Sequence, residues 1–227
     1  MYSFADIFKN KKRILFVTAH PDDIEVFFSG TVVKLRQQKT DCFFQILTSG
    51  CFGKSQNEKT KIREKEQLGS LKVVNVPRDC VDFAHLKDGF LENNHETISQ
   101  IVRVIRKWQP EIVCSFDPRT LIIKEKYIMH RDHRHCGQVT IDAIYPYARI
   151  DAFSPKYGSS FSVKEILLAD PSQKNVEVDI TKELEIKKKM LLTHKSQWDI
   201  TQINVLLNDN RIGNHYQEEF CYYKLNW

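Results

Sequence analysis

The stretch Arg13-Ile-Leu-Phe-Val-Thr-Ala-His-Pro-Asp-Asp-Ile-Glu25 decides the fold of this chain. Its apolar part, residues 14–19, predicts a strand that is buried on both faces, as in a parallel sheet. The strand ends abruptly in an imidazole and carboxylates, namely His20, Asp22, Asp23 and Glu25. Such groups suit a metal site at the carboxyl edge of a parallel sheet, where open α/β folds bind their ligands.

Strand and helix patterns alternate along the rest of the chain. Strands are expected at residues 14–19, 42–48, 80–83, 112–116 and 164–169, and helices at residues 25–38, 60–73, 96–108, 133–144 and 181–196. Within the helix at 25–38, Gly30 would permit close packing. Residues 145–162 form either an active-site flap or an ordered surface loop. This alternation predicts an α/β fold with a parallel sheet covered by helices on both faces.

Length and composition restrict the class of protein. A chain of 227 residues is enough for one domain of this type, spanning residues 1–227. Its apolar runs are too short to span a bilayer, and its first residues lack the apolar region of a secretory signal. We therefore expect a cytoplasmic protein. The six cysteines include no C-x-x-C pair, which argues against a disulfide scaffold and a cysteine zinc ribbon.

The charge is mildly basic, with a formal net charge of +5. Basic residues cluster at 9–13, 59–65, 124–134 and 187–189, and they suit an anionic substrate, a nucleic acid or simply solvated helix faces. A solvated face is the expectation for residues 187–189. No nucleic-acid-binding motif is present, and carboxylates stand where a dinucleotide-binding protein would carry a glycine-rich loop.

The first cluster has the residue types of a catalytic metal site. Zinc accepts imidazole nitrogen and carboxylate oxygen, and a catalytic site needs protein ligands and an open position for water. His20 and Asp23 are three residues apart and can point to one centre. Asp22 can then face the water as a catalytic base. The alternative is that one aspartate caps the following helix, which would leave His20 without a role.

The second cluster is His130-Arg131-Asp132-His133, which follows the strand at 112–116 after a loop of about a dozen residues. His133 can be a third ligand, and His130 can donate a proton or stabilise an oxyanion. Asp132 can fix the tautomer of an imidazole. Surface histidines or a helix cap at Asp132 are the alternatives. The neighbouring His135 and Cys136 are interpreted as structural.

Together, His20-Pro-Asp-Asp-x-Glu25 and His130-x-Asp-His133 resemble the PIG-L/LmbE-like zinc-dependent N-deacetylases. The resemblance covers most of the chain. It includes Arg63-x-x-Glu66, Pro110-Glu-Ile-Val113, Asp179-Ile-Thr181, His194-x-Ser-Gln197 and Glu218-x-Phe220. Arg131 departs from the commoner proline of the second motif.

The resemblance implies a Rossmann-like three-layer sandwich with a mostly parallel sheet and a metal site at the carboxyl edge of the strands. It implies Zn²⁺, or another divalent metal such as Fe²⁺, on His20, Asp23 and His133. Asp22 matches the general base, and His130 matches the group that polarises the carbonyl or protonates the amine. Asp132 matches the partner of that group, and Arg63 matches a substrate-binding position.

The activity expected from this resemblance is hydrolysis of an N-acetyl or other N-acyl group from an amino sugar, here a small molecule or conjugate that contains N-acetylglucosamine. A homo-oligomer is expected by the same analogy, and neither a nucleic-acid partner nor a membrane span is. Two other functions compete with this one: a metal-binding α/β protein without hydrolase activity, and a basic nucleic-acid-binding module. A closed structural metal site would need a fourth protein ligand, for which His135 is the local candidate.

Overall fold

The structure is a computed structural model that describes residues 1–51, 56–153 and 155–227. Among these residues, strands join into one sheet in the order β3-β2-β1-β4-β7-β10-β8, with β9 paired to β10 alone. The strands on one side of the sheet run parallel: β1 (Arg13–Thr18), β2 (Asp41–Thr48), β3 (Val81–Leu86), β4 (Ile112–Phe116) and β7 (Glu165–Ala169). The predicted mostly parallel α/β sheet is confirmed.

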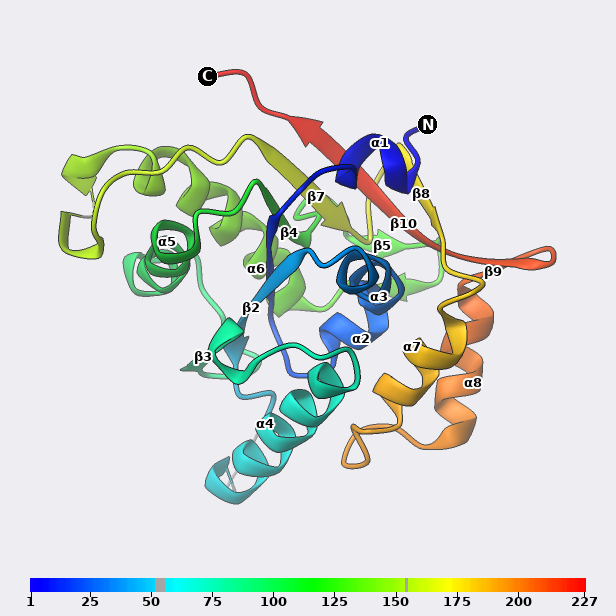
Figure 1. The fold of residues 1–227 in the computed structure, drawn as a ribbon. Helices are drawn as coiled ribbons and strands as arrows, with labels where there is room; N and C mark the ends of the chain where they lie inside the picture. Colours follow the sequence, from blue (N-terminus) through cyan, green and yellow to red (C-terminus); the bar gives the residue numbers. More distant parts are fainter. Residues whose placement is uncertain (52–55, 154) are drawn as a thin grey trace.

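The other side of the sheet is antiparallel. Strand β10 (His215–Lys224) lies between β7 and β8 (Val176–Asp179) and runs antiparallel to both, so a late segment of the chain extends the parallel sheet. The short β9 (Arg211–Ile212) forms a hairpin with β10, which Figure 1 shows projecting from the body of the molecule. A separate small hairpin joins β5 (Ile122–Ile123) to β6 (Tyr127–Ile128).

Helices cover both faces of the sheet, as Figure 1 shows. One face carries α5 (His95–Trp108) and α6 (Arg131–Asp142). The other carries α2 (Asp23–Phe27), α3 (Ser29–Gln37) and α7 (Leu184–Leu191). The remaining α-helices are α1 (Phe4–Phe8), α4 (Gln56–Val73) and α8 (Ile200–Asp209). Of the described helices, none is both long and apolar enough to cross a membrane.

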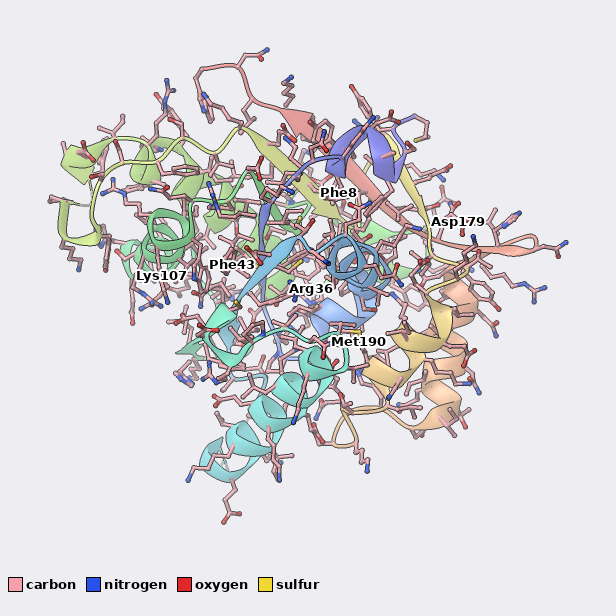
Figure 2. The ribbon with its side chains drawn as sticks, in the orientation of Figure 1. Phe8, Arg36, Phe43, Lys107, Asp179 and Met190 are labelled. Carbon is pink, nitrogen blue, oxygen red and sulfur yellow. The ribbon has the colours of Figure 1, made fainter. Side chains whose placement is uncertain are left out.

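Helix α5 shows how local sequence sets these elements. The Asn94 side chain caps its first turn by accepting from the Thr97 N–H at 3.0 Å. Gln109 ends the helix in the left-handed region, at φ 48°, and Pro110 follows. The apolar stripe faces the sheet, where Phe43 of β2 points toward α5 (Figure 2) and stacks on Trp108 with a centroid separation of 4.9 Å.

Two expected helices differ from the structure. The single helix predicted at 25–38 is broken at Phe28, where φ is −130°. The break exposes the N–H groups of Gly30 and Thr31, and the buried Glu218 carboxylate accepts both, at 2.9 and 2.8 Å. The close packing expected at Gly30 is confirmed, because a Cβ there would lie 2.4 Å from Ile180.

The helix predicted at 181–196 is wrong in length, because only α7 is helical within it. The chain then turns through residues 193–198 before α8 begins, so that the buried His194 side chain faces Glu25. A solvated face at 187–189 is wrong for Lys187, whose buried ammonium lies 2.7 Å from Glu218 Oε1 and donates to the Val26 carbonyl at 2.8 Å.

The described residues of the segment 145–162 pack beside α5. Residue 154 lies outside the described residues. The buried Arg106 side chain donates to the carbonyls of Tyr147, Ala148, Ile150 and Gly158, at 3.0, 3.2, 3.0 and 2.7 Å. One guanidinium therefore bonds to carbonyls along most of the segment. These bonds favour an ordered surface loop over an active-site flap.

Candidate metal centre and active site

The candidate site lies at the carboxyl edge of the parallel strands. Strands β1 and β4 are hydrogen-bonded neighbours, so the segments that follow them emerge at the same edge. His20 lies two residues after the end of β1, while His130 and His133 lie at the start of α6, after the β5–β6 hairpin. The topology thus explains why two clusters 110 positions apart in sequence meet in space.

The predicted ligands converge on Asp23. Its Oδ1 lies 3.0 Å from His133 Nε2, and its Oδ2 lies 3.5 Å from His20 Nδ1. The same Oδ2 accepts the backbone N–H groups of Ala19 and His20, at 3.0 and 2.8 Å. Asp23 therefore points back to the end of β1, and helix capping does not account for it. The assignment of these three residues as ligands stays a prediction.

More potential donors surround His20 than the sequence suggested. His20, His130 and His133 can bring one nitrogen each within 4.8 Å of one another, and so can ligand atoms of His20, Asp88 and Asp132. Asp88 Oδ1 lies 3.1 Å from His20 Nε2. Asp88 was missed by the sequence analysis, although its position two residues after β3 places it at the same sheet edge.

This donor set fits a divalent metal ion such as zinc or iron. Imidazole nitrogens and carboxylate oxygens are the ligands that these ions accept. Of the donors here, His20, Asp23 and Asp132 are buried. The His133 ring is fixed on the face of Phe116, with centroids 4.1 Å apart and planes 3° from parallel. Restricting the ring in this way limits the directions in which its nitrogens can point.

The carboxylate of Asp22 lies beside this cluster without joining it. Arg63 Nη2 lies 3.0 Å from Asp22 Oδ1, and the Trp198 indole N–H donates to Oδ2 at 3.0 Å. The backbone of Asp22 is left-handed, with φ 103°, and its N–H donates to Gln67 Oε1 at 2.9 Å. Although Asp22 precedes α2, its side chain makes no capping hydrogen bond, so the capping alternative fails for it.

Arg63 was predicted to bind substrate, and the structure shows where its guanidinium lies. Besides Asp22, it donates to the backbone carbonyls of Gly50 and Pro21. The Arg63 side chain is thus buried, and its guanidinium lies between the Asp22 carboxylate and these backbone carbonyls. Its substrate-binding role stays a prediction.

Burial and charge give the two neighbouring aspartates opposite pKa shifts. Burial raises the pKa of Asp22 to about 6, against the opposing charge of Arg63. For Asp23, burial is outweighed by the charges of His133 and His20, which hold its pKa well below the usual range. A carboxylate of raised pKa suits proton transfer at neutral pH, whereas one of lowered pKa stays ionised as a ligand.

His130 and Asp132 hold the start of α6. His130 Nδ1 accepts the Asp132 backbone N–H at 3.1 Å, which leaves the proton of a neutral imidazole on Nε2. The buried Asp132 carboxylate accepts the N–H groups of Gly89 and Leu91, at 2.7 and 3.2 Å. Its imidazole contact is with His20 Nε2, at 3.5 Å. Burial, together with the charges of His20 and His133, lowers the pKa of His130.

A buried polar network behind Asp22 was also missed. Glu25 Oε1 accepts from Gln67 Nε2 at 2.9 Å and from Ser70 Oγ at 2.7 Å, and its Oε2 lies 3.1 Å from His194 Nε2. Glu25 and His194 carried a sequence signal, since both lie in the quoted motifs. Gln67 and Ser70 carried none, because polar residues on a charged helix usually face solvent.

Comparisons with known proteins point to one family. The chain matches the family described as PIG-L, GlcNAc-PI de-N-acetylase, over residues 15–144. Diacetylchitobiose deacetylase of Thermococcus kodakarensis is 30% identical over 201 residues, which cover 84% of this chain and 72% of that protein. A probable N-acetyl-alpha-D-glucosaminyl L-malate deacetylase 2 of Bacillus anthracis is 28% identical over 148 residues, or 60% of this chain and 61% of that protein.

A solved structure has a similar fold along nearly the whole chain. N,N'-diacetylchitobiose deacetylase from Pyrococcus horikoshii, complexed with its inhibitor MPG, superimposes with a TM-score of 0.84 and 26% identity. The match covers 96% of this chain and 85% of that one. On the family match and these relatives, the chain belongs to the PIG-L family.

Proposed function

We propose that this protein is a metal-dependent hydrolase that removes the N-acetyl group from a small amino sugar containing N-acetylglucosamine. The observation that carries the proposal is the position of Asp22. The charges of Asp23 and His20 contribute to the pKa of its carboxylate, yet that carboxylate makes its contacts with Arg63 and Trp198. A carboxylate so placed can accept a proton from water without being consumed as a ligand.

His20, Asp23 and His133 would hold the metal. Bound there, a zinc or iron ion would supply Lewis acidity, which lowers the pKa of water and polarises the amide carbonyl. Asp22 accepts the proton of the water that attacks the amide carbon. His130, with its proton on Nε2, donates a hydrogen bond to the amide oxygen as negative charge develops there. The departing amine receives the proton that Asp22 took from the water.

The substrate class follows from the relatives. Two of them are named for deacetylation of diacetylchitobiose and of an N-acetylglucosaminyl malate, both of which carry N-acetylglucosamine. The supported substrate is therefore an N-acetylglucosamine unit attached to a second group.

An amine-release screen tests this function. Purified protein is incubated with N-acetylglucosamine, diacetylchitobiose and N-acetylglucosaminyl malate, with added zinc or iron and with a chelator. We expect release of free amine from at least one of the sugars and its loss in the chelator. Metal-loaded protein that deacetylates none of them, or activity that survives complete removal of metal, would contradict the proposal.

Three accompanying expectations also remain proposals: one domain over residues 1–227, a cytoplasmic location, and assembly into a homo-oligomer. Light scattering after gel filtration tests the last. A mass equal to that of one chain at micromolar concentration would refute it.

A further inference from the structure

Trp198 contacts the carboxylate to which the proposed function gives the base role. We propose that it is a positioning residue, which holds the Asp22 carboxylate in the orientation needed for proton transfer. This inference rests on the proposed function of the same site. Trp198 lies between α7 and α8, far along the chain from the two motifs that contain the proposed ligands.

The two oxygens of Asp22 are held by different groups. Arg63 Nη2 lies 3.0 Å from Oδ1, and the indole N–H of Trp198 donates to Oδ2 at 3.0 Å. The terminal torsion of an aspartate is broad, so a single anchor leaves the plane of the carboxylate free to turn. With Arg63 on one oxygen and Trp198 on the other, the plane of the carboxylate is fixed. The direction of the lone pairs that receive the proton is fixed with it.

An indole is well suited to this task. Its N–H is a donor only, and it neither gives up nor accepts a proton at any pH of interest. Trp198 can therefore orient the ionised carboxylate without competing for the proton that Asp22 collects.

The indole is itself held in place. The Trp198 backbone N–H donates to the His194 carbonyl at 2.9 Å, and the half-buried ring packs against the small apolar cluster of Leu191, Ile203 and Leu207. The donor therefore sits on a packed surface, and no loop has to become ordered to bring it to Asp22.

Glu25 links Trp198 and Asp22 a second time. It contacts His194, whose carbonyl anchors Trp198, and it accepts from Gln67, whose Oε1 accepts the Asp22 N–H. One buried carboxylate thus fixes both the backbone of Asp22 and the turn that carries its second anchor. The side chain of Asp22 and the turn are positioned relative to the same group.

The experiment compares Trp198→Phe with Trp227→Phe, in the full chain loaded with zinc. Phenylalanine keeps an aromatic ring at either site but removes the N–H. Trp227 is a matched control, because its indole N–H donates to the Val163 carbonyl at 3.2 Å, away from the site. The measured quantities are kcat and KM on the sugar found in the screen, bound zinc, and the midpoint of thermal unfolding.

We expect Trp198→Phe to lower kcat by about 10-fold or more, since a small misplacement of a catalytic group can cost up to about 100-fold. KM, zinc content and the unfolding midpoint should stay close to those of Trp227→Phe. A kcat no lower than that of Trp227→Phe would overturn the inference. So would a fall in activity matched by lost zinc or lost folded protein, because that pattern belongs to a purely structural role.

A second measurement does not depend on activity. Unfolding free energies of Trp198→Phe, Asp22→Ala and the double variant form a double-mutant cycle, which isolates the coupling between the two side chains. Non-additive effects are expected, and additive effects would overturn the inference. If no sugar is deacetylated by the wild-type protein, the proposed function fails, while this cycle still decides whether Trp198 holds Asp22.

Discussion

Asp22 combines properties that suit a general base with a strained backbone. It is buried, its carboxylate has a raised pKa, and its left-handed backbone is a conformation that costs a residue other than glycine about 1–3 kcal/mol. Surrounding hydrogen bonds hold this conformation, through the Gln67 side chain at the backbone and through Arg63 and Trp198 at the carboxylate. Strain that is retained at one residue of a site is typical of function.

Asp22→Asn should abolish proton transfer while leaving the shape of the site intact. We expect kcat to fall by about 10²- to 10⁴-fold, the usual contribution of a general base, and bound zinc to stay at the wild-type level. Amine release and metal analysis of the same sample measure both. Near-normal turnover with zinc bound would show that another group is the base.

His194 gives a pH-dependent contribution to stability. The negative charge of Glu25 raises its pKa, although burial opposes the shift. The folded state then holds the proton more tightly than the unfolded chain, in which histidine has a pKa of about 6.5. This stabilisation is therefore full below that pH. It is lost as the pH rises through the folded pKa.

Urea unfolding between pH 6 and 9, in the presence of a chelator, measures this effect. We expect the free energy of unfolding to fall more steeply with pH in the wild-type protein than in His194→Asn. The exposed His215 is the control, and His215→Asn should keep the wild-type slope. Parallel slopes for all three proteins would mean that folding does not raise the pKa of His194.

At the scale of single residues, the sequence predicts the site residues that lie in a compact motif just after a strand. His20, Asp22 and Asp23 are recognisable because ionisable side chains are unusual immediately after an apolar, buried strand. Gln67 and Trp198 are not, since their contacts depend on how α4 and the turn after α7 pack against α2. Nothing in the local sequence around these residues encodes that packing.

At the scale of elements, the junction of α2 and α3 depends on one glycine. A Cβ on Gly30 would lie 2.4 Å from Ile180, which has no free space in a buried core. Gly30→Ala should therefore lower the free energy of unfolding by about 1–3 kcal/mol, the usual cost of overpacking. Urea denaturation measures the difference.

Gly69 in α4 provides the opposite case for comparison. A Cβ there meets no atom within 4 Å. Gly69→Ala should raise the free energy of unfolding by about 0.4–1 kcal/mol, because alanine restricts the unfolded chain and favours the helix. Equal effects of the two substitutions would refute the role given to Gly30.

Elements with a strong internal pattern were predicted well, and elements that depend on distant partners were not. The boundaries of β4 match the predicted strand at 112–116 because five apolar or small residues lie between Glu111 and Asp117. The break at Phe28 was missed because its cause, the Glu218 carboxylate, comes from β10. The separate α8 was missed because the turn before it is fixed by the buried contact of His194.

At the scale of the whole molecule, the proposed ligands join the two halves of the parallel sheet. His20 and Asp23 follow β1, while His133 belongs to α6 after β4. A metal bound by both segments should stabilise the folded chain by mass action. At free zinc about 100 times the Kd, the gain is about 2.7 kcal/mol, which for a chain of this size raises the unfolding midpoint by roughly 5–10 °C.

Differential scanning calorimetry with zinc and with a chelator measures this shift. We expect His133→Asn to remove most of it and His215→Asn to leave it unchanged. A midpoint that does not respond to zinc in the wild-type protein would exclude the proposed ligands.

The place of β10 between β7 and β8 has a consequence for synthesis in the cell. A ribosome delivers residues 215–224 after every other described element, yet Glu218 of this strand holds the start of α3 and, through Lys187, the end of α2. Before residues 215–224 have been translated, one edge of β7 has no partner strand, and the junction of α2 and α3 lacks the Glu218 carboxylate. The sheet is therefore complete only after residues 215–224 have been synthesised, and until then β7 offers an open edge with which a strand of another polypeptide could pair.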